Sequence, residues 1–82
     1  MSQVIVRLPE VLSRTGLGRS SIYSRVAARL FTPPVPLGGR AVGWPVREID
    51  AINSARIAGK TDDEIRELVA KLYADRKLAA AA

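Results

Sequence analysis

The chain has 82 residues, with 13 Lys or Arg against 8 Asp or Glu and a formal net charge of +5. It contains no histidine and no cysteine, so zinc fingers, disulfide frameworks, thiol nucleophiles and imidazole bases are all excluded. We therefore expect one small domain with no structural metal, no cofactor and no catalysis of its own, close to the size at which folding alone is marginal.

The first residues, 1–3, do not combine a basic region with a long apolar run, and no stretch of the chain approaches the roughly 18 apolar residues of a membrane span. The lack of cysteine suits a reducing compartment. We expect a cytoplasmic protein that does not act at a membrane.

The first predicted helix covers residues 9–15. Pro9 suits the first helical position, and Leu8, Val11 and Leu12 are spaced as the apolar face of a helix. Gly16 can adopt the left-handed conformation that ends a helix. A short turn, residues 16–18, is expected to follow.

The second predicted helix runs from Arg19 to Arg29. Ile22, Val26 and Leu30 form one apolar stripe at helical spacing. The other face carries small side chains, Ser20, Ser21, Ser24 and Ala28. Such a face leaves room for a ligand to approach the backbone closely.

A β-hairpin is predicted after residues 32–34, where two prolines end helical structure. The strands are expected at 35–37 and 41–44, with a tight turn at 38–40 because paired glycines favour hairpins. Pro36 lacks an N–H group and must lie on an edge strand. The hairpin is expected to rest on the helices, because two strands alone are marginally stable. The residues that make this contact are expected to be Leu37, Val42 and Trp44, with Trp44 in the core rather than on a ligand site.

A third helix is predicted from Pro45 to about Ala58, and Gly59 ends it. Its inward residues are expected to be Val46, Ile49, Ile52 and Ile57.

The fourth helix begins at Thr61, which forms a predicted capping box with Glu64. Its apolar stripe consists of Ile65, Leu68, Val69, Leu72 and Tyr73. This stripe either docks on the domain or pairs with a second copy of the chain. We divide the chain into residues 1–60, one folded domain, and 61–82, an amphipathic helix whose alanine-rich tail frays from Leu78.

The positive charge is concentrated in residues 7–47, which hold seven arginines against the single acidic residue Glu10, a net +6. The remaining residues sum to −1. Guanidinium groups donate paired hydrogen bonds to phosphates and base edges, so this segment favours nucleic acid as the partner. A generic basic surface is the alternative at this point. The arginines are Arg7, Arg14, Arg19, Arg25, Arg29, Arg40 and Arg47.

The order helix, turn, helix and hairpin is typical of a winged helix-turn-helix fold, here mainly α with a small β-hairpin and a C-terminal helix. The second helix would enter the major groove, and the hairpin would lie on the backbone or in the minor groove. Individually, the same side chains could be solvated charges or helix caps, and Tyr23 could be mainly packed. The candidate DNA-binding residues are Arg19, Ser20, Ser21, Tyr23, Ser24 and Arg25 in the helix and Arg40 at the hairpin tip.

Three strings carry a resemblance to a known family: R-L-P-E-V-L at 7–12, T-G-L-G-R-S-S-I-Y at 15–23 and L-G-G-R-A-V-G-W at 37–44. They resemble the AlpA family of phage-type regulators, within the MerR-like and excisionase-like winged-helix group. The likeness covers residues 7 to about 58, and the third string is more specific to the family than the second. Gly18 stands where the family usually has serine, and Ile52-Asn53 replaces a more usual Trp-Ile.

The resemblance implies a double-stranded DNA-binding protein of a prophage or integrative element. It implies the recognition-helix residues named above, with Gly39 joining Arg40 in the wing. The function would be that of an excisionase, a recombination directionality factor that assists a site-specific integrase, or that of a transcriptional activator. Copies would associate head to tail on DNA.

Other functions fit the residues less well. An enzyme would need activating groups around Tyr23 or Ser20 that this chain lacks. RNA binding is disfavoured because no aromatic platform for unstacked bases is evident. A pure protein-interaction module would leave the arginines unexplained.

Overall fold

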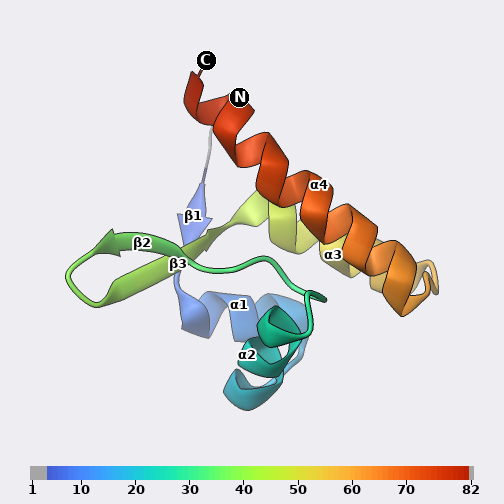
Figure 1. Cartoon of the computed structure of the whole chain (residues 1–82). Helices are drawn as coiled ribbons and strands as arrows, with labels where there is room; N and C mark the ends of the chain where they lie inside the picture. Colours follow the sequence, from blue (N-terminus) through green and yellow to red (C-terminus); the bar gives the residue numbers. More distant parts are fainter. Residues whose placement is uncertain (1–3, 82) are drawn as a thin grey trace.

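The computed structural model describes residues 4–81, and their side chains as far as Leu78. Our expectations for residues 1–3 and for Ala82 therefore lie outside the described residues. The fold is mainly helical with a small antiparallel sheet and has the predicted winged helix-turn-helix arrangement plus a C-terminal helix (Figure 1). The elements are β1 (Ile5–Val6), α1 (Leu8–Thr15), α2 (Arg19–Ala27), β2 (Val35–Gly38), β3 (Ala41–Pro45), α3 (Val46–Ile57) and α4 (Asp62–Ala81).

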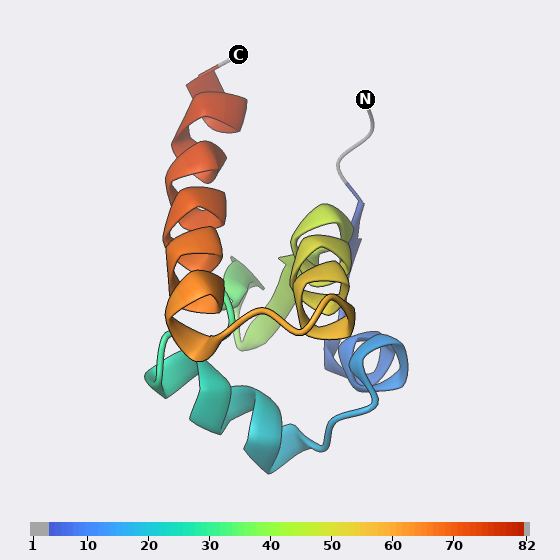
Figure 2. The same cartoon turned by 90° about the vertical axis from the view of Figure 1, so that its right-hand side faces the viewer.

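The sheet lies in the middle of the molecule in Figure 1, with α1 and α2 on one side and α3 and α4 on the other. Figures 1 and 2 also show that both described ends of the chain, at residues 4 and 81, lie away from α2, and that they are well apart from each other in the view of Figure 2. Within the described residues, none of the helices combines the length and the apolar character of a membrane span.

The sheet has three strands in the order β1-β3-β2. The β2–β3 hairpin is confirmed, and Pro36 lies on an edge strand as expected, opposite Val42. Strand β1 was not predicted. It pairs antiparallel with β3, and the Val46 N–H donates to the Val4 carbonyl oxygen at 2.8 Å. The β-branched run at residues 4–6 was the available signal for this strand.

Strand β1 explains why the hairpin needs glycine at position 43. Gly43 is buried between the two outer strands, and a Cβ there would lie 2.6 Å from Ile5 Cγ2 and 2.9 Å from the Val6 carbonyl oxygen. Leu37 covers the same spot, its Cδ1 standing 3.1 Å from that Cβ position. Glycine therefore lets three strands approach closely.

The two helices of the helix-turn-helix differ in how they end. Gly16 ends α1 in the left-handed conformation, with φ 72°, as predicted. Helix α2 ends at Ala27 rather than at Arg29, because Arg29 itself is left-handed with φ 65°. The Leu30 N–H donates to the Arg25 carbonyl oxygen at 2.8 Å, which closes a Schellman motif around Arg29.

The core surrounds Trp44, which is fully buried as expected. Its indole N–H donates to the Thr32 carbonyl oxygen at 2.8 Å, and Phe31 meets its ring edge-on at a centroid distance of 6.2 Å. Two expectations were wrong: Leu37 is 42% exposed because it covers the outer face of the sheet, and Ile57 is 88% exposed because it faces solvent at the end of α3. The other fully or nearly buried apolar side chains of the core are Val11, Ile22, Ile49 and Ile52, and on α4 Ile65 and Val69.

Helix α4 packs against α3 of the same chain, with Leu68 and Leu72 half-buried beside the core and Tyr73 52% exposed. The capping box is confirmed: the Thr61 N–H donates to Glu64 Oε1 at 2.9 Å, and the Glu64 N–H donates to Thr61 Oγ1 at 3.2 Å. The helix continues to Ala81, past Leu78, where we expected it to fray.

Helices α3 and α4 are also joined by an ion pair. Arg76 on α4 donates to both oxygens of Glu48 at 2.7 and 2.8 Å. The Glu48 side chain is fully buried at the start of α3, and that of Arg76 is 18% exposed. The same guanidinium donates to the Pro33 carbonyl oxygen at 2.7 Å, so it ties three segments together.

Candidate nucleic-acid interface

Helix α2 presents a face of small side chains to solvent. Ile22 is fully buried and Val26 packs against the core, so the opposite side of the helix, with Ser20, Ser24 and Ala27, is exposed. The helix starts after Gly18, and no side chain caps its free backbone amides. These amides and the positive end of the helix dipole can receive a phosphate group.

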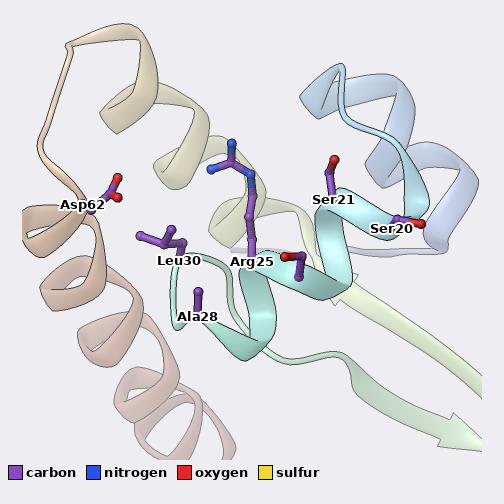
Figure 3. A pocket seen from close by; sticks show the side chains of 7 residues that line it. Ser20, Ser21, Arg25, Ala28, Leu30 and Asp62 are labelled. Atoms are coloured by element: carbon purple, nitrogen blue, oxygen red, sulfur yellow. The ribbon is translucent and has the colours of Figure 1, made fainter.

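An open hollow of about 530 Å³ runs along one flank of α2. Figure 3 shows Arg25 between the serines of α2 and Asp62 at the start of α4. No ion pair joins Arg25 and Asp62 within the described part of the chain. Sequence reasoning missed Asp62 because only the packing of α4 places it at the rim of the hollow. The predicted residues that line this hollow are Ser20, Ser21, Ser24 and Arg25.

Arg19 and Tyr23 lie on the other flank of α2. The Tyr23 ring meets Trp44 edge-on at a centroid distance of 6.2 Å and remains 38% exposed. Arg19, one helical turn earlier on the same side, is exposed. The predicted residues of the recognition helix are therefore divided between two flanks, with Ser20 and Ser24 between them.

The wing, which is the β2–β3 hairpin, projects away from the helices (Figure 1). Its turn depends on glycine, with φ 109° at Gly38 and 55° at Gly39. Gly39 therefore shapes the turn, and the side chain of Arg40 next to it is exposed. Within residues 4–81, no hydrogen bond or ion pair joins the wing tip to α2, so any ligand that contacts both must span the distance between them.

Most arginines of residues 7–47 form no ion pair among the residues that the structure describes. Arg14 is the exception: its Nε lies 2.9 Å from Glu10 Oε2, and its Nη1 lies 3.9 Å from Asp50 Oδ1. The positive charge of the helix-turn-helix and wing is therefore available to an external anion. The arginines without an ion pair in the described part of the chain are Arg7, Arg19, Arg25, Arg29, Arg40 and Arg47.

Two polar residues of α3 fix the orientation of the helix-turn-helix. Asn53 Nδ2 donates to the Arg14 carbonyl oxygen at 2.9 Å, and Arg56 Nη1 donates to the Thr15 carbonyl oxygen at 3.0 Å. These carbonyls lie at the end of α1, where no intrahelical donor is available. Asn53, which departs from the family pattern, thus holds α1 and the turn that leads to α2.

Among the described residues, no group of three or more Asp, Glu, His or Cys side chains is placed to hold a metal ion. The polar side chains that α2 itself contributes to the hollow are three hydroxyls and one guanidinium group, which bind anions and hydrogen-bond acceptors, and the Asp62 carboxylate of α4 stands at the rim.

Comparisons with known proteins give two matches. The model of the family described as "Prophage CP4-57 regulatory protein (AlpA)" matches residues 4–57. The chain is also similar to the uncharacterized protein ORF88 of Enterobacteria phage P4, with 44% identity over 55 residues. That alignment covers 67% of this chain and 62% of the phage protein, so less than two thirds of the relative is spanned. No solved structure matches the chain.

Proposed function

Because the chain belongs to the AlpA family of prophage regulatory proteins, we propose that it binds specific sites in the double-stranded DNA of a mobile genetic element. We further propose that it acts there as an excisionase, which directs a site-specific integrase toward excision. It would do so in the bacterial cytoplasm.

The observation that carries DNA binding is the exposed face of α2, where Ser20 and Ser24 lie between Arg19 and Arg25. A helix with small side chains outward fits the major groove of B-DNA, where each base pair presents a distinct pattern of donors and acceptors. An arginine on each flank can read a guanine or hold a phosphate. The serines and the uncapped amides after Gly18 can bind the backbone.

The wing supplies the second contact in this proposal. Arg40 is exposed at its tip and has no ion pair within residues 4–81. A hairpin of this kind can follow the phosphate backbone or enter the minor groove next to the recognition helix.

We propose that residues 1–60 form the DNA-binding domain and that residues 61–82 support it. A single small module buries only about 600–1,000 Å² of its surface on DNA, so affinity calls for several copies. The proposal therefore includes head-to-tail association of copies on adjacent sites, which would bend or mark the DNA for the integrase. Sedimentation on a long site tests this: a strict one-to-one complex with unbent DNA would contradict it.

Arg19 and Arg40 are predicted to contribute differently to DNA binding. Arg19→Ala should weaken binding to the cognate site by about 1–3 kcal/mol and relax the preference at one base pair. Arg40→Ala should weaken binding to all duplexes evenly and lower the slope of log K against log salt by about 1, because it removes a phosphate contact. Fluorescence anisotropy with cognate and scrambled duplexes over a salt series measures both quantities.

Lys71→Ala is the matched control, since Lys71 carries the same charge on α4 and is paired with Asp75 at 3.4 Å. It should leave both quantities unchanged. If Arg19→Ala bound every duplex like the parent protein, the assignment of α2 as the recognition helix would be wrong. Competition with double-stranded RNA of the same length separates DNA binding from RNA binding.

A second candidate function is transcriptional regulation, which the description of the matching family favours. The physical task on DNA is the same, and only the position of the sites differs. Footprinting across the attachment site and the promoters of the element decides between them. Protection at the attachment site, with integrase-dependent excision in a reconstituted reaction, supports the excisionase; protection at promoters alone supports the regulator.

A further inference from the structure

A groove on α4 lies outside the proposed DNA interface. It consists of two adjoining depressions, of about 260 and 490 Å³, which share Pro33 and Tyr73. One wall is α4, and the other is the segment that connects α2 to β2. We call it the α4 groove.

The lining of the α4 groove is mainly apolar. Val69 and Ala70 contribute from α4, Phe31 lies at the base of the opposite wall, and the prolines of residues 33–36 continue that wall. Tyr73 is 52% exposed within the groove. A concave surface of this composition binds apolar side chains, and a phosphate backbone has none to bury there.

The charges around the α4 groove are all positive. No acidic side chain lines either depression in the described part of the chain. Two of the four cations are internally neutralised, since Arg66 pairs with Asp63 and Arg76 pairs with Glu48. The other two, Arg29 and Lys77, have no ion pair within residues 4–81. The rim therefore complements an acidic ligand.

The two walls of the groove are tied together, so the groove is formed before any ligand binds. Arg66 Nε donates across it to the Ala28 carbonyl oxygen at 3.0 Å, and Arg76 Nη2 donates to the Pro33 carbonyl oxygen at 2.7 Å. Arg76 also lies over the Tyr73 ring, with Cζ 5.3 Å from the centroid, which limits the freedom of that ring. A preformed site loses less conformational entropy on binding.

We propose that the α4 groove binds an acidic peptide segment of a partner protein. Apolar side chains of this segment would lie along Val69, Ala70 and Tyr73, and its carboxylates would pair with Arg29 and Lys77. The proposal goes beyond DNA binding. None of the candidate DNA-contacting residues of α2 and the wing lines this groove, so a peptide and a duplex can be bound at once.

The test uses a displayed library of random dodecapeptides, selected on the full chain. The expected result is enrichment of sequences with several Asp or Glu and at least two large apolar residues. A synthetic peptide of the enriched sequence, labelled with fluorescein, then gives a Kd by anisotropy. On the ¹⁵N-labelled protein this peptide should shift the amide signals of Phe31, Thr32 and Val35 and of residues 70–77.

The sharpest variant is Ala70→Glu, which places bulk and negative charge in the groove at an exposed helix position. It should weaken peptide binding at least tenfold. Ala70→Lys, of similar bulk and opposite charge, should weaken binding less. Ala74→Glu makes the same change one turn later on α4, where the side chain lines neither depression, and should leave the Kd within about twofold.

The proposal would be overturned if the selection enriched no peptides, or if it enriched basic ones. It would also be overturned if Ala70→Glu left the Kd unchanged, or if a DNA duplex displaced the peptide. DNA binding of the same variants is measured in parallel. It should stay at the parental level, so failure of the peptide proposal and failure of the DNA proposal are distinguishable.

Discussion

Gly43 is the glycine at which the packing of the sheet leaves no room for a side chain. Gly43→Ala should lower the free energy of unfolding by about 1–3 kcal/mol, the usual cost of overpacking. The added Cβ would meet the Ile5 side chain at 2.6 Å and the Val6 carbonyl oxygen at 2.9 Å, and the second of these is backbone. Urea unfolding followed by circular dichroism measures the loss. Gly18→Ala is the control, because a Cβ at Gly18 meets nothing within 4 Å; equal losses in both variants would contradict the close approach of β1.

Glu64 is the residue whose protonation should change the free energy of unfolding. Its pKa is lowered from the ordinary value of 4.5, chiefly because the Thr61 backbone amide donates to the carboxylate, with smaller contributions from the Thr61 side chain and from Lys60. A pKa that is lower in the folded state means that the ionised carboxylate favours folding. This stabilisation is present above pH 4.5 and is lost as the pH falls through the lowered pKa.

Glu64→Gln removes the titrating group and keeps a side chain that can complete a capping box. The difference in unfolding free energy between parent and variant should therefore be constant near neutral pH and change only in the acid range below 4.5. Urea unfolding at a series of pH values measures it, and the subtraction removes the contributions that parent and variant share. A difference that does not change with pH would show that the capping box does not affect the titration.

At the scale of elements, the attachment of α4 to α3 depends on the pair Glu48–Arg76. Arg76→Met should cost about 3–5 kcal/mol, because it leaves the fully buried carboxylate without a partner. Adding Glu48→Gln should recover part of this loss, since a neutral amide is cheaper to bury. A double-mutant cycle by thermal unfolding measures the coupling. Additive losses would mean that the two side chains do not depend on each other.

The sequence predicted the helix ends and turns that depend on the residue types of a few neighbouring positions. The capping box at Thr61, the left-handed glycines and the glycine turn of the wing all lie where the sequence predicts them. Strand β1 was missed because two residues become a strand only when β3 is beside them. Helix α2 ends early because Arg29, a residue without glycine's freedom, adopts a left-handed conformation that its residue type does not indicate.

At the scale of the whole molecule, the sequence predicted which side chains carry the charge but not how the fold distributes them. Arg19 and Arg25 of α2 were identified from the sequence. That Arg19 lies on the flank of Trp44 and Arg25 on the flank of Asp62 follows from how the domain packs. The family match ends at residue 57, yet Ile65 and Val69 on α4 belong to the same core. The folded unit is therefore larger than the segment that resembles the family.

Both described ends of the chain, at residues 4 and 81, lie away from α2, and Figure 2 shows them well apart from each other (Figures 1 and 2). A fluorophore, an affinity tag or a fused protein attached at either end would thus leave the molecule away from α2. Tandem copies could be joined through a flexible linker without threading it past bound DNA.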